Sequence, residues 1–159
     1  MRLWVAGLAF VASVQTASAL SCLPPDIRRM YQEAAGSAEV YFLVEGRVSH
    51  SGGMPIGNHD IDALPPEMTE VAGTFDGVAY GWSRDVAFEA DITLEVACLA
   101  GWCGGLESGT DVLGFLRKTV DGYALSVGPC GGLTMAGVTE EMRAQARSCL
   151  EGGLCEPEF

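Results

Sequence analysis

The chain has 159 residues, of which 21 are acidic and nine are basic, so its formal net charge is −12. This excess of negative charge argues against nucleic acid or an anionic membrane as a partner, because both bind basic surfaces. The acidic residues are spread along the chain, which is typical of a solvated surface and names no ligand.

The first 19 residues have the three parts of a cleavable secretory signal peptide. Arg2 precedes an apolar run over 3–14, and the Ala-Ser-Ala sequence at 17–19 is a peptidase site. The run is too short to span a bilayer, which needs about 20 apolar residues. We therefore expect a signal peptide at 1–19, one exported domain at 20–159 and no transmembrane segment, with the mature protein in the periplasm or outside the cell.

Two other processing routes concern Cys22. Cleavage after Ser21 would make Cys22 the mature N-terminus and leave it a free amine. A lipoprotein signal would acylate the same cysteine, but Leu20 lies one place late for a good lipobox. The site after Ala19 is the better one, so we expect Leu20 and Ser21 to remain.

The mature chain begins with a short predicted helix over 26–35, where apolar residues recur at helical spacing and Gly36 can end it. Alternating apolar residues then predict a strand over 39–48. The segment 49–66 is rich in Gly, Pro, Asn and Asp, which predicts a long loop.

Two further strands are predicted after this loop. The stretch 68–82 is strand-like, and its apolar residues change parity near Asp76 and Gly77, which predicts a bulge or bend. Strict alternation over 88–100 predicts a strand whose buried face carries Ile92, Leu94, Val96, Cys98 and Ala100.

The last part of the chain combines a hairpin and a helix. Asp121-Gly122 lies between alternating runs at 112–119 and 123–127, which is a strong hairpin signal. Thr139 is the expected N-cap of a helix over 139–150, whose inner face carries Met142, Ala146, Cys149 and Leu150. Five strands with a helix near each end predict an all-β core: a bent antiparallel sheet that closes into a barrel. The alternative is a β-sandwich, which usually needs about seven strands.

All six cysteines follow the predicted cleavage site. An even number in an oxidising compartment indicates three disulfides, and the spacing does not choose among the possible pairings. The cysteines are Cys22, Cys98, Cys103, Cys130, Cys149 and Cys155.

No group of residues predicts an active site, a metal site or a cofactor site. Cys103 invites comparison with thioredoxin-type sites, but these need a second cysteine three residues later, where this chain has Leu106. A Gly-x-Ser-x-Gly nucleophile motif is absent from the sequence. The predicted 49–66 loop carries potential metal ligands, but their spacing matches neither zinc sites nor calcium loops. These are His50, His59, Asp60 and Asp62.

Three features together resemble the netrin-like module, the OB-fold barrel of tissue inhibitors of metalloproteinases (TIMPs). They are Cys22-Leu23-Pro24 before a short helix, Cys103-Gly104 after a long strand, and the segments 111–116 and 121–130, the latter ending at Cys130. The likeness is closer to uncharacterised bacterial relatives than to the animal inhibitors. It implies that the five-stranded barrel is OB-fold-like.

The resemblance also implies disulfides. In the inhibitors, the first cysteine of an N-terminal Cys-x-Cys places its amine and carbonyl on a catalytic zinc, and both cysteines are bonded to the barrel. This chain has only Cys22 there, and Pro24 aligns it with the second cysteine of that pair. The implied bond joins Cys22 to Cys130, or to Cys103 if Cys22 replaces the first cysteine. Cys98 or Cys103 would then be tied to the C-terminal cysteines at 149 and 155.

We therefore expect a monomeric, exported, non-enzymatic module that binds a protein and regulates a protease or another envelope protein. The expected contact residues are Cys22, Leu23, Pro24 and Pro25, together with the 49–66 loop. One alternative is a structural or assembly factor of the cell envelope. The other is a thiol-redox protein built on Cys103.

Overall fold

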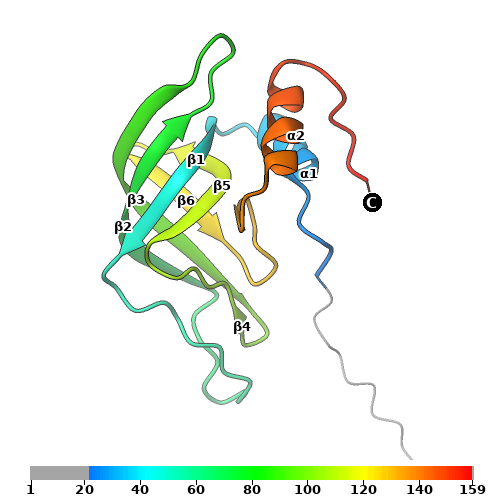
Figure 1. Ribbon diagram of the computed structural model, residues 1–159. Coiled ribbons are helices and arrows are strands. Elements are labelled where there is room, and N and C mark those ends of the chain that lie inside the picture. Colours follow the sequence, from blue (N-terminus) through cyan, green and yellow to red (C-terminus); the bar gives the residue numbers. More distant parts are fainter. Residues whose placement is uncertain (1–21, 159) are drawn as a thin grey trace, which may run out of the picture.

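The structure, a computed structural model, describes residues 22–158 (Figure 1). The predicted signal peptide and both candidate cleavage sites lie outside these residues. Within them, no helix is long and apolar enough to cross a membrane.

Five strands close into a barrel, as predicted. Strand β1 pairs with β2 and β5, β3 pairs with β2 and β6, and β5 pairs with β6, so the order β1-β2-β3-β6-β5 returns to β1. Four of these pairs are antiparallel, and β3 and β6 are parallel. This is an OB-fold-like Greek-key barrel. Its strands are β1 (Tyr41–His50), β2 (Met68–Ala79), β3 (Val86–Leu99), β5 (Thr110–Lys118) and β6 (Tyr123–Val127).

Two short strands and two helices complete the fold. Strand β4 (Trp102–Cys103) forms a hairpin with the end of β3, and β7 (Thr134–Ala136) pairs with β5. Helices α1 (Ile27–Gly36) and α2 (Glu140–Leu150) lie side by side against one side of the barrel (Figure 1). Thr139 caps α2 as predicted, because its hydroxyl accepts a hydrogen bond from the backbone N–H of Met142 at 3.2 Å.

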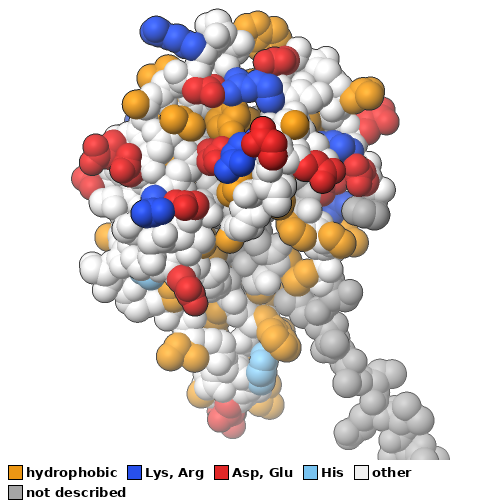
Figure 2. Space-filling view, in the orientation of Figure 1, with side chains coloured by type: hydrophobic (Ala, Val, Ile, Leu, Met, Phe, Trp, Pro, Cys, Tyr) orange, Lys and Arg blue, Asp and Glu red, His pale blue; other side chains and the backbone are white. Residues whose placement is uncertain are grey.

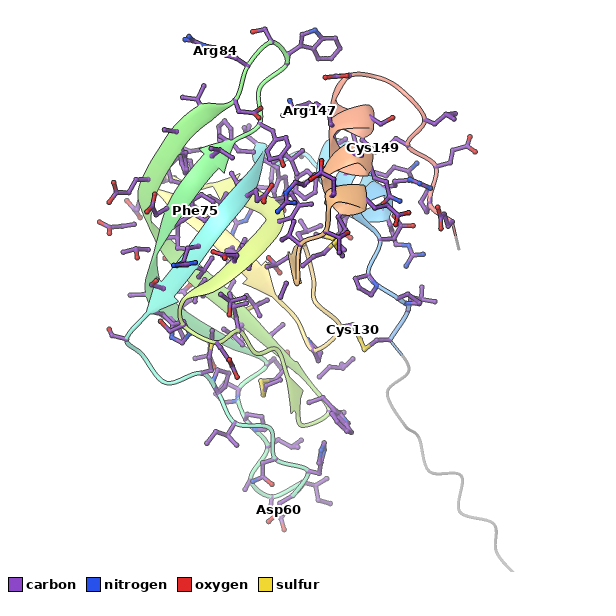
Figure 3. The ribbon with its side chains drawn as sticks, viewed as in Figure 1. Asp60, Phe75, Arg84, Cys130, Arg147 and Cys149 are labelled. Atoms are coloured by element: carbon purple, nitrogen blue, oxygen red, sulfur yellow. A yellow bond between two sulfur atoms is a disulfide. The ribbon has the colours of Figure 1, made fainter. Side chains whose placement is uncertain are left out.

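Two apolar cores explain which residues are buried. The first fills the barrel and includes Phe75, which Figure 3 labels, and Leu94. Both side chains are fully buried. The second lies between the barrel and the two helices and includes Leu113 and Phe115. Strand β5 separates the two cores, so its residues are buried on both faces and its sequence reads as a continuous apolar run. On β3 the predicted alternation is confirmed from Ile92 to Cys98, whereas Ala100 is exposed.

The predicted bulge near Asp76 and Gly77 is absent. The registers of β2 with β1 and with β3 both continue through these residues without an unpaired position. The change of parity has another cause: Ala79 packs against the barrel core, and the next residue, Tyr80, packs against the helix core. Gly77 is needed because a Cβ atom there would lie 2.2 Å from the carbonyl oxygen of Glu45 on β1.

Three disulfides join all six cysteines. Cys22–Cys130 agrees with the pairing that the resemblance implied. The implied links from the barrel cysteines to the C-terminal ones are wrong, because each of those pairs is local. Cys98 bonds Cys103 across the β3–β4 hairpin, and Cys149 on α2 bonds Cys155 in the tail that follows the helix. The Cys103 thiol on which a thiol-redox function would depend is therefore bonded to Cys98.

Candidate functional site

Exposed apolar side chains gather at one end of the barrel. The β1–β2 loop (51–67) and the β3–β4 turn meet there, at the bottom of Figure 1. Figure 2 shows hydrophobic groups exposed over this end. We call the following five side chains the apolar ridge: Ile56, Ile61, Leu64, Leu99 and Trp102, which are 86%, 83%, 47%, 58% and 49% exposed. Exposed apolar groups that gather in this way are typical of interaction surfaces, so the ridge is the candidate binding surface of this chain.

The two segments of the ridge are joined backbone to backbone. A Cβ atom on Gly57 of the loop would lie 2.7 Å from the carbonyl oxygen of Gly101 in the turn. A Cβ on Gly101 would lie 2.2 Å from the carbonyl oxygen of Asn58, and the φ of Gly101 is +85°. Only glycine at both positions allows this approach.

Side chains reinforce the same junction. The rings of His59 and Trp102 are in contact, with their centroids 4.7 Å apart and their planes tilted by 56°. His59 Nδ1 lies 3.3 Å from the carbonyl oxygen of Ala100. The Cys98–Cys103 disulfide closes the base of the turn. The turn is therefore a fixed support on which the loop rests.

Hydrogen bonds within the loop shape its tip. The side-chain amide of Asn58 donates to the carbonyl oxygen of Ala63 at 3.0 Å, and its oxygen accepts from the N–H of Asp60 at 3.0 Å. The carboxylate of Asp60 accepts from the N–H of Asp62 at 3.1 Å. The bonds from the N–H groups of Asp60 and Asp62 form Asx turns, which hold a loop without regular strand pairing. The predicted loop is thus ordered by its own polar side chains.

The histidines and aspartates of this loop are not brought together. The ring of His50 lies between the carbonyl oxygens of Gly52 and Leu106, each 2.9 Å from one ring nitrogen, whereas His59 contacts Trp102. In residues 22–158, no group of three or more His, Cys, Asp or Glu side chains could hold a metal ion.

The predicted N-terminal contact residues line a separate cavity of about 380 Å³. Residues 22–25 form one wall, the first turns of α1 form another, and the turn at 130–132 forms the third. Leu23 is 62% exposed beside it. No residue of the 49–66 loop lines this cavity, and Figure 3 shows Cys130 well away from Asp60 at the loop tip. The structure therefore does not join the two predicted contact regions into one pocket.

A second cavity, about 660 Å³, lies between β1, β2 and α2, but its charged groups are already paired. Glu45 accepts from the Tyr80 hydroxyl at 2.6 Å and from Arg143 Nε at 2.8 Å. Burial, with the hydrogen bond to Glu45, raises the pKa of Tyr80 far above its usual value. Arg147 donates two hydrogen bonds to Asp85 and lies over the Tyr80 ring. This network fastens α2 to the barrel.

Sequence reasoning missed two members of the ridge, Leu99 and Trp102. The signal that could have found them is a glycine, Gly101, in a tight turn flanked by two large apolar residues.

Comparisons of the chain with family models, with curated proteins and with solved structures give no match. The netrin-like resemblance therefore depends on the residues and segments described above.

Proposed function

We propose that this chain is an exported, disulfide-stapled binding module without enzymatic activity, which docks on a protein partner through the apolar ridge. The observation that carries the proposal is the ridge itself: five large exposed apolar side chains on two segments that are fixed to each other. A preformed surface loses little conformational entropy when it binds, which favours affinity.

Export is supported by the cysteines and by the N-terminal sequence. Three intramolecular disulfides are compatible with an oxidising compartment, where such bonds persist. The Ala-Ser-Ala site at 17–19 after an apolar run is typical of a secretory signal peptide. The periplasm and the extracellular space both fit these features.

Regulation of a protease, or of another envelope protein, is the role that the netrin-like resemblance adds to this proposal. The barrel order and the Cys22–Cys130 bond are compatible with that module. The chain lacks the Cys-x-Cys whose first residue approaches zinc in the inhibitors. We therefore propose docking through side chains of the ridge, without chelation of a partner's metal.

The test uses the domain 20–159, produced in an oxidising compartment and immobilised. Exported proteins from the source cells are passed over the wild type, over Ile56→Ser/Ile61→Ser and over a control, Val120→Ser/Leu154→Ser. The control also replaces two exposed apolar residues, which are 99% and 85% exposed and lie outside the ridge. Circular dichroism verifies that all three proteins are folded.

We expect one protein to be retained by the wild type and the control and released by the ridge variant. A panel of secreted metalloproteases tests the regulatory role in the same way, since inhibition should disappear in the ridge variant alone. The proposal fails if the ridge variant retains everything that the wild type retains.

A further inference from the structure

Among residues 22–158, the β1–β2 loop (51–67) and the β3–β4 turn, which form the loop end of the barrel, carry no Lys or Arg. Between residues 48 and 83, and again between 85 and 116, the sequence contains neither Lys nor Arg. On the face that Figure 2 draws, the blue side chains lie over the upper and middle parts of the molecule, and none lies over the loop end. The described cations are Arg28, Arg29, Arg47, Arg84, Arg117, Lys118, Arg143 and Arg147.

The segments at this end of the barrel carry carboxylates instead. Asp60 and Asp62 lie at the loop tip, Glu67 lies where the loop ends, and Glu107 follows β4. All four are exposed. None of them belongs to an ion pair among residues 22–158, whereas Asp85 and Glu45 near the helices are each paired with an arginine.

This charge pattern discriminates among molecules that could cover the ridge. A second copy of the chain would bring eight carboxylates together, and like charges at an interface cost several kcal/mol. An anionic membrane would be repelled for the same reason. A surface that offers lysine or arginine around an apolar socket would instead pair with each carboxylate that the chain leaves unpaired.

We propose that the partner of the ridge is a cationic protein surface, with an apolar socket bordered by Lys or Arg side chains. This inference rests on the proposed function and specifies its partner. Ile56, Ile61 and Trp102 fill the socket and supply most of the affinity, because buried apolar and aromatic anchors dominate interfaces. The carboxylates act at the rim, where they raise the association rate and set the orientation.

The probe for the test is the protein retained by the wild type and released by Ile56→Ser/Ile61→Ser, once it has been identified and purified. Its dissociation constant is measured at low and high salt for the wild type and for two variants of equal net charge. Asp60→Asn/Asp62→Asn removes the rim charges, and the asparagine at 60 can still accept the hydrogen bond from the N–H of residue 62. Glu89→Gln/Glu151→Gln removes two exposed charges outside the loop end.

We expect Asp60→Asn/Asp62→Asn to weaken binding by roughly fivefold at low salt, the effect of losing two exposed ion pairs. The difference should disappear at high salt, where exposed charges are screened. The control variant should bind as the wild type does. Equal binding by all three proteins at both salt concentrations would overturn the cationic partner and leave the proposed function intact.

Two further measurements address the competing occupants. Sedimentation of the chain alone should show a monomer, and vesicles of zwitterionic or anionic lipid should not bind it. Dimerisation that Ile56→Ser/Ile61→Ser abolishes, or vesicle binding that this variant abolishes, would overturn the inference. If no protein distinguishes the wild type from that variant, both the inference and the proposed function are refuted.

Discussion

The Cys22–Cys130 disulfide should stabilise the fold more than either of the other two. It joins residues 108 positions apart, whereas Cys98–Cys103 and Cys149–Cys155 join residues five and six apart. A cross-link lowers the entropy of the unfolded chain by an amount that grows with the logarithm of loop length. At 25 °C this corresponds to roughly 5 kcal/mol for the long loop and roughly 2 kcal/mol for each short one.

The perturbation is the pair Cys22→Ala/Cys130→Ala, compared with Cys149→Ala/Cys155→Ala. Cys22 is exposed, so its replacement removes little packing and the loss comes from the unfolded chain. Cys149 is buried, so its replacement by alanine also removes packing, which adds about 1 kcal/mol to the stability lost with the Cys149–Cys155 disulfide. The expected losses are therefore roughly 5 and 3 kcal/mol.

Urea unfolding followed by far-ultraviolet circular dichroism measures both losses on oxidised protein. Domains of this kind have total stabilities of about 5–15 kcal/mol, so the first variant should unfold at far lower urea than the wild type. If removal of Cys22–Cys130 lowers the free energy of unfolding by no more than removal of Cys149–Cys155, loop-closure entropy does not explain how this disulfide stabilises the fold.

Four other substitutions test the fold. Gly77→Ala should destabilise the fold by about 2 kcal/mol or more, because its Cβ would lie 2.2 Å from the Glu45 carbonyl oxygen. The control Gly36→Ala meets no atom within 4 Å and should stabilise the fold by about 0.5 kcal/mol. Thermal unfolding of both variants measures the difference. Leu94→Ala empties part of the barrel core and should cost about 3 kcal/mol in urea, and a loss below 1 kcal/mol would contradict its full burial. Hydrogen bonds from Arg147 lower the pKa of Asp85 below its usual 3.8, so the folded state releases this proton more readily than the unfolded state. The stability that Asp85 contributes is complete above about pH 4 and is lost as the pH falls further, and Arg147→Leu should remove this part of the pH dependence of urea unfolding.

The sequence predicted correctly the elements that depend on interactions between residues close together in the chain. Asp121-Gly122 can form a tight hairpin turn whatever lies elsewhere in the chain, and β5 and β6 do meet there. The alternation around Leu94 reports a strand with one face in a core. The hydroxyl oxygen of Thr139 caps α2 by accepting a hydrogen bond from the N–H of Met142, only three residues later in the sequence.

Features that depend on contacts between distant residues were harder to predict. The parity change in β2 suggested a bulge, because a single sequence does not reveal that Ala79 and Tyr80 enter different cores. The ridge depends on the contact between Gly57 and Gly101, which lie 44 positions apart. The residues around each glycine give no sign of this contact. The Cys98–Cys103 bond depends on β4, a strand of two residues that alternation cannot detect.

The central claim is that the apolar ridge is where this chain meets its protein partner. Photocross-linking in the exporting cells tests it most directly, with benzoylphenylalanine at position 61 on the ridge and, separately, at position 120. The side chains native to these positions, Ile61 and Val120, are 83% and 99% exposed, so a chance encounter would label both. The account predicts one discrete adduct from position 61 and none from position 120. Equal labelling at the two positions, or no adduct at position 61, would contradict it.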